Sequence, residues 1–244
     1  VLITGTSVGG IGFETARAVA LNSANMIIIT GHNAERLKIT QDAIKKEIPS
    51  ANIHPLVLNL SSLAAVRKAA AEVNALPGPL HVLIHNAAAP VEAFKLTVDG
   101  LENQAATNHI SPFLLTKLLA PKLLAARTAD YTPRVVFVSA AGHAYCTDGV
   151  NFDTLENPKS EGFDPMNAYC QTKASNVMTA IELSKRSKGQ INAYSLHPGV
   201  INTNLMHKGV VPEGLKQSAL FDADEKPHDN DTFRWKTIPQ GAAT

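Results

Sequence analysis

The chain opens with Val1-Leu2-Ile3-Thr4-Gly5-Thr6-Ser7-Val8-Gly9-Gly10-Ile11-Gly12, which carries the clearest indication of its fold. A short apolar run leads into a glycine-rich turn, after which apolar residues recur at helical spacing. Glycines let the backbone approach a pyrophosphate, and the start of a helix offers free N–H groups and a positive dipole end. The stretch predicts a phosphate-binding loop; a tight turn with a purely structural role is the alternative. The expected contacts are Gly5, Thr6, Ser7, Gly10, Ile11 and Gly12.

The alternation of strand and helix continues along most of the chain. Strand-like apolar runs occupy residues 1–4, 26–30, 53–58, 81–85, 135–139 and 191–196. Helix-like periodicity occupies residues 11–22, 34–48, 63–76, 101–127 and 168–185. Continuous apolar strands separated by helices predict a parallel sheet with both faces covered. Right-handed crossovers favour the doubly wound α/β sheet of the Rossmann type, in one domain over residues 1–244.

Composition excludes several classes of protein. The chain has 244 residues, 18% of them charged, with 22 Lys+Arg against 21 Asp+Glu. This balance provides no electrostatic basis for binding nucleic acid, and no apolar run reaches the roughly 18–20 residues of a membrane span. Cys146 and Cys170 predict free thiols in a reducing, cytoplasmic location. The nine histidines show no paired metal spacing, so no metal site is expected.

The residues after the second strand bear on the choice of nucleotide. Rossmann domains that prefer NAD usually carry an acid at this point, which holds the ribose hydroxyls. Here Gly31 is followed by His32, Asn33 and Arg36, which suit a 2′-phosphate. The pattern predicts NADP(H) rather than NAD(H). The alternative is that Asn33 caps the next helix and Arg36 is simply solvated.

Tyr169 and Lys173 provide the strongest catalytic signal. Four residues apart, they share one helix face. A free phenol near pKa 10 is a poor acid-base group at neutral pH, and a nearby ammonium would lower the pKa of Tyr169. The motif Y-x-x-x-K is common by chance, but here it follows the fifth strand and precedes the sixth. We therefore expect Tyr169 as general acid or base, with Lys173 also able to reach ribose hydroxyls.

Together these motifs resemble the short-chain dehydrogenases/reductases. That family's TGxxxGxG loop is one residue longer here, since Gly10 and Gly12 lie five and seven positions after Gly5. Residues 85–88 resemble its NNAG segment, and residues 198–203 its PGxxxT segment. Asn59-Leu60 resembles its adenine contact. The resemblance implies further cofactor contacts at Asn86, Ala87, Pro198, Gly199, Val200 and Thr203, together with Tyr169 and Lys173.

The resemblance also implies two further catalytic positions. Asn108 matches a helix asparagine that holds a water in the family's proton relay; an asparagine bonded within its own helix is the alternative. The family's fifth strand commonly ends Ser-Ser, and the second serine donates to the substrate oxygen. Here Ser139 is followed by Ala140, so either residue can occupy that place, depending on the alignment. A serine hydroxyl bonded only to backbone is the alternative for Ser139.

The implied activity is hydride transfer between a nicotinamide and a lipophilic alcohol or carbonyl, as in the retinol-dehydrogenase-like branch. We expect residues 205–239 to form a mobile lid over the substrate, and the natural chain to extend beyond both ends. Apolar residues at Phe113, Leu114, Leu118 and Leu119 indicate core, or a contact between subunits of a homo-oligomer. A nucleotide-binding module without turnover, favoured by Ala140, is the main alternative. A sugar-nucleotide epimerase or dehydratase is a second, opposed by the short segment after Thr203.

Overall fold

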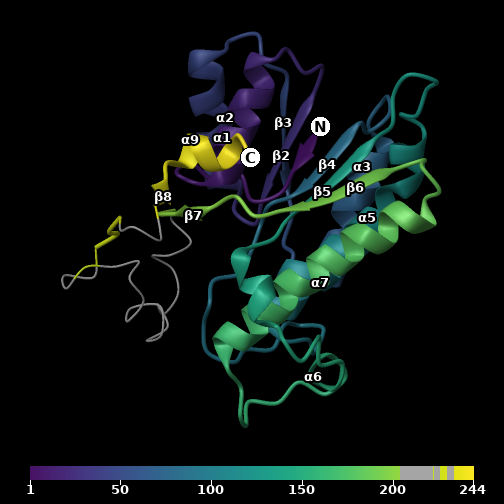
Figure 1. Ribbon diagram of the computed structural model, residues 1–244. Coiled ribbons are helices and arrows are strands. Elements are labelled where there is room, and N and C mark those ends of the chain that lie inside the picture. Colours follow the sequence, from purple (N-terminus) through teal and green to yellow (C-terminus); the bar gives the residue numbers. More distant parts are fainter. Residues whose placement is uncertain (204–221, 223–225, 230–233) are drawn as a thin grey trace.

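Six parallel strands form the central sheet of the computed structural model, which describes residues 1–203, 222, 226–229 and 234–244 (Figure 1). Their order across the sheet is β3-β2-β1-β4-β5-β6. The strands are β1 (Leu2–Ile3), β2 (Ile27–Gly31), β3 (Ile53–Val57), β4 (Val82–His85), β5 (Arg134–Val138) and β6 (Asn192–Leu196). The predicted doubly wound sheet is confirmed. The order reverses between β1 and β4, where the carboxyl ends of the strands leave room for a ligand.

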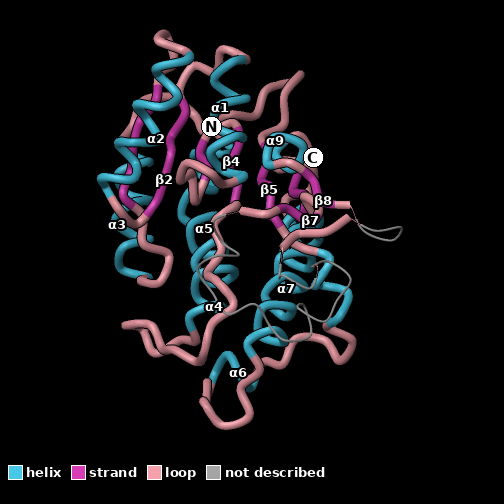
Figure 2. The backbone as a smooth tube through the Cα atoms, turned by 90° about the vertical axis from the view of Figure 1, so that its left-hand side faces the viewer, coloured by secondary structure: helices cyan, strands magenta, loops and turns pink. Residues whose placement is uncertain are grey.

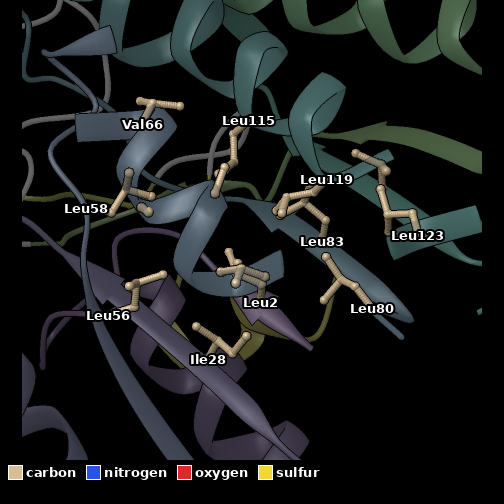
Figure 3. Packing of buried hydrophobic residues seen from close by; sticks show 14 of the residues in the cluster. Leu2, Ile28, Leu56, Leu58, Val66, Leu80, Leu83, Leu115, Leu119 and Leu123 are labelled. Atoms are coloured by element: carbon tan, nitrogen blue, oxygen red, sulfur yellow. The ribbon is translucent and has the colours of Figure 1, made fainter. Parts of the chain in front are cut away.

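Helices cover both faces of the sheet (Figures 1 and 2). The helices α1 (Ile11–Leu21) and α2 (Ala34–Glu47) pack on one face, and α3 (Leu63–Ala75), α5 (Ser111–Leu124) and α7 (Pro165–Arg186) pack on the other. Neighbouring strand residues alternate between the two cores, because successive side chains in a strand point to opposite faces. Leu2 and Ile28 therefore face Leu115 and Leu119, as Figure 3 shows, whereas Ile3 packs with α1 and α2.

The helix starts follow cap signals in the sequence. Asn33 and Ser62 accept hydrogen bonds from the first turns of α2 and α3. Helix α7 begins at Pro165, three residues before the start at residue 168 that the sequence predicts. The side chain of Asp164 accepts hydrogen bonds from the N–H groups of Met166 and Asn167, and Pro165 takes the first helical position. Both residue types favour a helix start there, which places Tyr169 in the second turn of the helix.

Three segments differ from the predicted pattern. The helix expected over residues 101–127 is α4 (Asn103–Ala105), a π-helical turn η1 (Ala106–Ile110), and α5. The irregular stretch 145–166 contains the end of a 3₁₀ turn, η2 (Ala141–Tyr145), and α6 (Asp153–Glu156). Near the C-terminus, β8 (Trp235–Lys236) pairs with β7 (Val200–Ile201), and α9 (Ile238–Ala242) packs beside α1 (Figure 1).

Two expectations concern the C-terminal part and the membrane. Most of the lid expected over residues 205–239 lies outside the described residues. Within the part of the chain that the structure describes, no helix combines the length and apolar character that crossing a bilayer requires.

Candidate active site

The glycine-rich turn joins the carboxyl ends of β1 and β4. The Asn86 side chain donates to the carbonyl oxygens of Thr4 and Gly5 at 2.9 and 3.0 Å. The Thr4 hydroxyl oxygen accepts from the backbone N–H groups of Asn86 and Ala87, both at 3.0 Å. A Cβ at Gly5 would lie 2.8 Å from the Cα of Ala87. The predicted contacts Asn86 and Ala87 therefore lie directly against the loop.

The additional residue in this loop is accommodated by a turn. The N–H of Gly10 donates to the Ser7 carbonyl at 3.2 Å, and Gly9 has a φ of +80°. A residue in this left-handed region is ordinarily glycine. The insertion therefore adds a tight turn before α1 and leaves Gly12 in the first helical turn.

The start of α1 suits an anionic group. Gly10 is its N-cap, and no side chain caps the first-turn N–H groups. Uncapped amides at a helix start bind phosphate well. The one acid of this turn, Glu14, is paired with Arg17 at 2.8 Å. The glycine cradle and the uncapped amides both fit the diphosphate of a dinucleotide.

Close packing predicts the effect of a methyl group at Gly12. A Cβ there would contact the Gly5 carbonyl oxygen and lie 2.5 Å from the Asn86 Nδ2. We expect Gly12→Ala to lower the free energy of unfolding by about 1–3 kcal/mol, the usual effect of overpacking. The variant should also weaken nucleotide binding, because the loop must move.

Chemical denaturation and calorimetric titration would measure both effects. Gly31→Ala is the matched control, since its Cβ would lie 3.6 Å from the nearest atom, Cδ2 of Leu37. An equally stable Gly12→Ala variant with unchanged affinity would contradict this account of the loop.

The residues predicted for the adenine and ribose end lie at the carboxyl ends of β2 and β3. His32, Asn33 and Arg36 are all exposed beside the end of β2. The Asn33 side chain also accepts a hydrogen bond from the N–H of Arg36 at 2.9 Å, so the capping role is present. After β3, the Asn59 side chain accepts from the Ser61 hydroxyl at 2.8 Å, and Leu60 is buried.

Tyr169 and Lys173 meet on one face of α7. The Lys173 ammonium lies 5.3 Å from the centroid of the Tyr169 ring and donates to the Val138 carbonyl at 2.9 Å. Burial lowers the pKa of Lys173 to about 8. Burial, with a smaller contribution from Cys170, raises the pKa of Tyr169 to about 12. The expected lowering of the tyrosine pKa is thus absent: desolvation of the phenolate is the largest effect, and the ammonium is itself bound to backbone.

Asn108 bridges the loop after β4 and helix α7. Its side-chain oxygen accepts from the N–H of Ala89 at 2.7 Å, and its Nδ2 donates to the Thr172 hydroxyl oxygen at 3.2 Å. Both bonds join Asn108 to other segments, so its side chain does not adopt the alternative arrangement, in which it would bond within its own helix. Asn108 belongs to the π-helical turn η1, and such turns frequently accompany functional sites.

The Ser139 hydroxyl is bonded to the backbone of α7. Its side chain is buried, and the hydroxyl donates to the Lys173 carbonyl at 2.8 Å. The backbone-bonded alternative therefore describes this serine, and its hydroxyl is engaged within the fold. Ala140, the next residue, is partly exposed and is the N-cap of η2. The position that follows the buried serine thus carries no hydroxyl.

The loop after β6 adds the last predicted contacts. The chain leaves β6, forms a short loop and enters β7; this segment carries the predicted contacts Pro198, Gly199, Val200 and Thr203. Gly199 has a φ of +105°, and a Cβ there would lie 2.6 Å from the Lys236 side chain. Lys236 on β8 therefore packs over this loop.

Some residues around the site were not predicted from sequence. The Thr172 hydroxyl accepts a hydrogen bond from the Asn108 side chain and donates one to the Tyr169 carbonyl oxygen at 2.7 Å. Gln104 is fully buried and donates to the Pro165 carbonyl at 2.9 Å, joining α4 to the start of α7. The only sequence signal for Thr172 is its place inside the Y-x-x-x-K segment, and no local pattern marks Gln104.

Comparison with known proteins agrees with this geometry. A sequence model of the short chain dehydrogenase family matches residues 1–149. The chloroplastic short-chain dehydrogenase TIC 32 A of Brassica napus is 37% identical over 249 residues, which cover 100% of this chain and 73% of the relative. The polyprenol dehydrogenase of Mus musculus is 33% identical over 220 residues, which cover 88% of this chain and 64% of that protein.

Solved structures show the same architecture. A short-chain dehydrogenase from Sphingobium yanoikuyae, in complex with NADPH, has a TM-score of 0.72 at 16% identity, covering 99% of this chain and 80% of that one. The family match and the sequence identity to these relatives indicate common descent in addition to a common fold. The chain therefore belongs to the short-chain dehydrogenase/reductase family of oxidoreductases.

Proposed function

We propose that this chain is an NADPH-dependent reductase of lipophilic carbonyl compounds, with Tyr169 as the proton donor. The observation that carries the proposal is the pair of a partly buried Tyr169 and a buried Lys173, whose ammonium is bonded to the last residue of β5. A phenol whose pKa is about 12 keeps its proton at neutral pH, so Tyr169 is suited to give a proton to a carbonyl oxygen rather than to take one from an alcohol.

Each polar residue of the site then has a distinct task. The phosphate loop and Asn86-Ala87 hold the dinucleotide, which supplies the hydride when bound. Tyr169 transfers its proton to the substrate oxygen. The Lys173 ammonium, 5.3 Å from the ring centroid, stabilises the phenolate that remains. Asn108 holds α7 against the loop after β4 and links Tyr169 to water.

The cofactor preference rests on the exposed basic edge at the end of β2. We expect NADPH to bind at least about tenfold more tightly than NADH, a difference of about 1.4 kcal/mol, because no acid follows Gly31 before Glu35. Arg36→Glu should remove most of this preference by repelling the 2′-phosphate. Calorimetric titration of both cofactors provides the measurement.

A charge-matched control separates local contact from overall charge. Lys38→Glu makes the same change on the same helix, at an exposed residue paired with Asp42 at 3.0 Å, and should leave the preference unchanged. Tighter binding of NADH by the wild type would refute the assignment.

The lipophilic substrate class is supported by the polyprenol dehydrogenase relative. Reduction of decanal, benzaldehyde and cyclohexanone, followed by NADPH absorbance, tests it. Ala140 favours a second function, a nucleotide-binding module without turnover, because a carbonyl site without that hydroxyl lacks one donor. NADPH binding without reduction of any such carbonyl would select the second function.

A further inference from the structure

The start of α7 carries Tyr169 and extends beyond the ends of the sheet strands. In Figures 1 and 2, the first turns of this helix run past the strands towards α6. The ammonium of Lys173 is bonded to the last residue of β5, but that contact lies one helical turn after Tyr169. The position of the phenol therefore depends on what holds the first turn of α7.

Gln104 binds this first turn from the segment that follows β4. Its side chain is fully buried on α4, and its Nε2 donates to the Pro165 carbonyl oxygen at 2.9 Å. In an α-helix, each N–H donates to the carbonyl four residues earlier, so the Pro165 carbonyl is also the acceptor of the Tyr169 N–H. Gln104 therefore shares its acceptor with the backbone N–H of Tyr169.

A second side chain of the same segment acts on the other side of the Tyr169 backbone. The Tyr169 carbonyl oxygen accepts from the Thr172 hydroxyl at 2.7 Å, and the Thr172 oxygen accepts from the Asn108 side chain at 3.2 Å. Gln104 and Asn108 lie four residues apart, on α4 and on the π-helical turn η1 that continues it. One continuous segment thus contacts α7 both before and after Tyr169.

The amide of Gln104 is retained at an energetic cost. Its Oε1 is buried and has no hydrogen-bond partner among the described residues, and a buried, unpaired acceptor is unfavourable. If residue 104 were apolar, the Pro165 carbonyl would still be paired with the Tyr169 N–H, so no orphaned group would remain. An apolar side chain of similar size should therefore support the fold equally well, and the amide needs another explanation.

We propose that Gln104 is a positioning residue, which fixes the first turn of α7 so that the Tyr169 hydroxyl is aimed at the substrate oxygen. The hydroxyl stands at the far end of its side chain, so a small rotation of the helix start displaces it more than the backbone. A displacement of about 1 Å can lower a rate by about 10²-fold. The inference rests on the proposed function, because it requires Tyr169 to be the proton donor.

Gln104→Met removes the amide and keeps a side chain of similar length. We expect kcat for decanal reduction to fall by about 10–10²-fold, with unchanged NADPH affinity. Urea unfolding should show a variant at least as stable as wild type, because the orphaned oxygen is gone. The solvent deuterium isotope effect on kcat should increase, because a misplaced phenol makes proton transfer more rate-limiting.

A matched control makes the same substitution elsewhere. The Nε2 of Gln41 on α2 also donates to a backbone carbonyl, that of Ile53, at 3.0 Å. Gln41→Met therefore loses a bond of the same kind and should keep the wild-type kcat and isotope effect. Gln104→Leu repeats the test at the proposed position with a different apolar shape, which guards against a packing fault peculiar to methionine.

A double-mutant cycle with Tyr169→Phe separates positioning of the phenol from general support of the fold. If Gln104 acts through the tyrosine hydroxyl, Gln104→Met should lower kcat much less in the Tyr169→Phe protein than in wild type. An equal loss in both backgrounds would overturn the proposal, because the effect would then not pass through the hydroxyl.

The outcomes are distinguishable from failure of the proposed function. If wild type binds NADPH and reduces no carbonyl, or if Tyr169→Phe keeps full turnover, the reductase proposal fails and this inference fails with it. If Tyr169→Phe is impaired while Gln104→Met and Gln104→Leu keep the wild-type kcat, the role of Gln104 alone is overturned. Loss of stability together with activity in both apolar variants would make Gln104 a structural residue and would also overturn its positioning role.

Discussion

Tyr169→Phe should lower the turnover of carbonyl reduction by about 10²–10⁴, the usual effect of losing a general acid, with little change in NADPH affinity. The substitution removes the proposed proton donor and keeps the ring, so its packing against η2 remains. The Asn86 side chain is bonded to the phosphate loop, at the carbonyl oxygens of Thr4 and Gly5, and keeps these bonds in the variant. Burst and steady-state kinetics, with calorimetric titration of NADPH, provide the two measurements.

The same variant has a built-in check on folding. Because desolvation raises the pKa of Tyr169 to about 12, its hydroxyl is uncharged at neutral pH, and the phenylalanine variant is expected to unfold at the same or a slightly higher denaturant concentration. Unchanged turnover in a folded Tyr169→Phe protein would refute the proposed chemistry. Reduced turnover accompanied by an equal loss of NADPH affinity would assign Tyr169 to cofactor binding instead.

Lys173→Met should separate catalysis from stability. We expect turnover to fall by about 10²–10⁴, because the phenolate of Tyr169 loses its neighbouring ammonium. The free energy of unfolding should instead increase. Burial lowers the pKa of Lys173 from 10.5 to about 8, so between these pH values the unfolded chain binds more protons than the native protein. The wild type therefore gains stability as pH rises through this window, and the penalty is fully present below about pH 8.

Methionine carries no charge and has a similar length, so the variant lacks this penalty. The free energy of unfolding of Lys173→Met, measured against wild type in urea from pH 7 to about 10, should exceed that of wild type most at the low end. A variant that is less stable by the same amount at every pH would show that the hydrogen bond to the Val138 carbonyl outweighs the cost of burying the ammonium. Lys185→Met, at the exposed end of the same helix, is the control.

The layered fold follows from signals that act over a few neighbouring residues. Strand residues such as Leu2 and Ile3 are apolar on both faces, which only a sheet covered on both sides accommodates. Periodicity and caps act over a few residues, so they can be read without tertiary contacts. The same holds for Tyr169 and Lys173, whose shared helix face follows from a spacing of four residues. The Asp164 cap was equally local, and its signal was present although the predicted helix start missed it.

The roles of these side chains within the site depend on contacts between segments that are far apart in the sequence. The hydroxyl of Ser139 bonds to Lys173, 34 residues later, and Asn108 bonds to Thr172, 64 residues later. Whether the pKa of Tyr169 rises or falls depends on how far packing excludes water from the phenol. The sequence, which shows only the nearby ammonium, predicted a lowered pKa, whereas the pKa is raised. Burial and hydrogen-bond partners arise when elements distant in sequence meet at one sheet edge, so no local pattern records them.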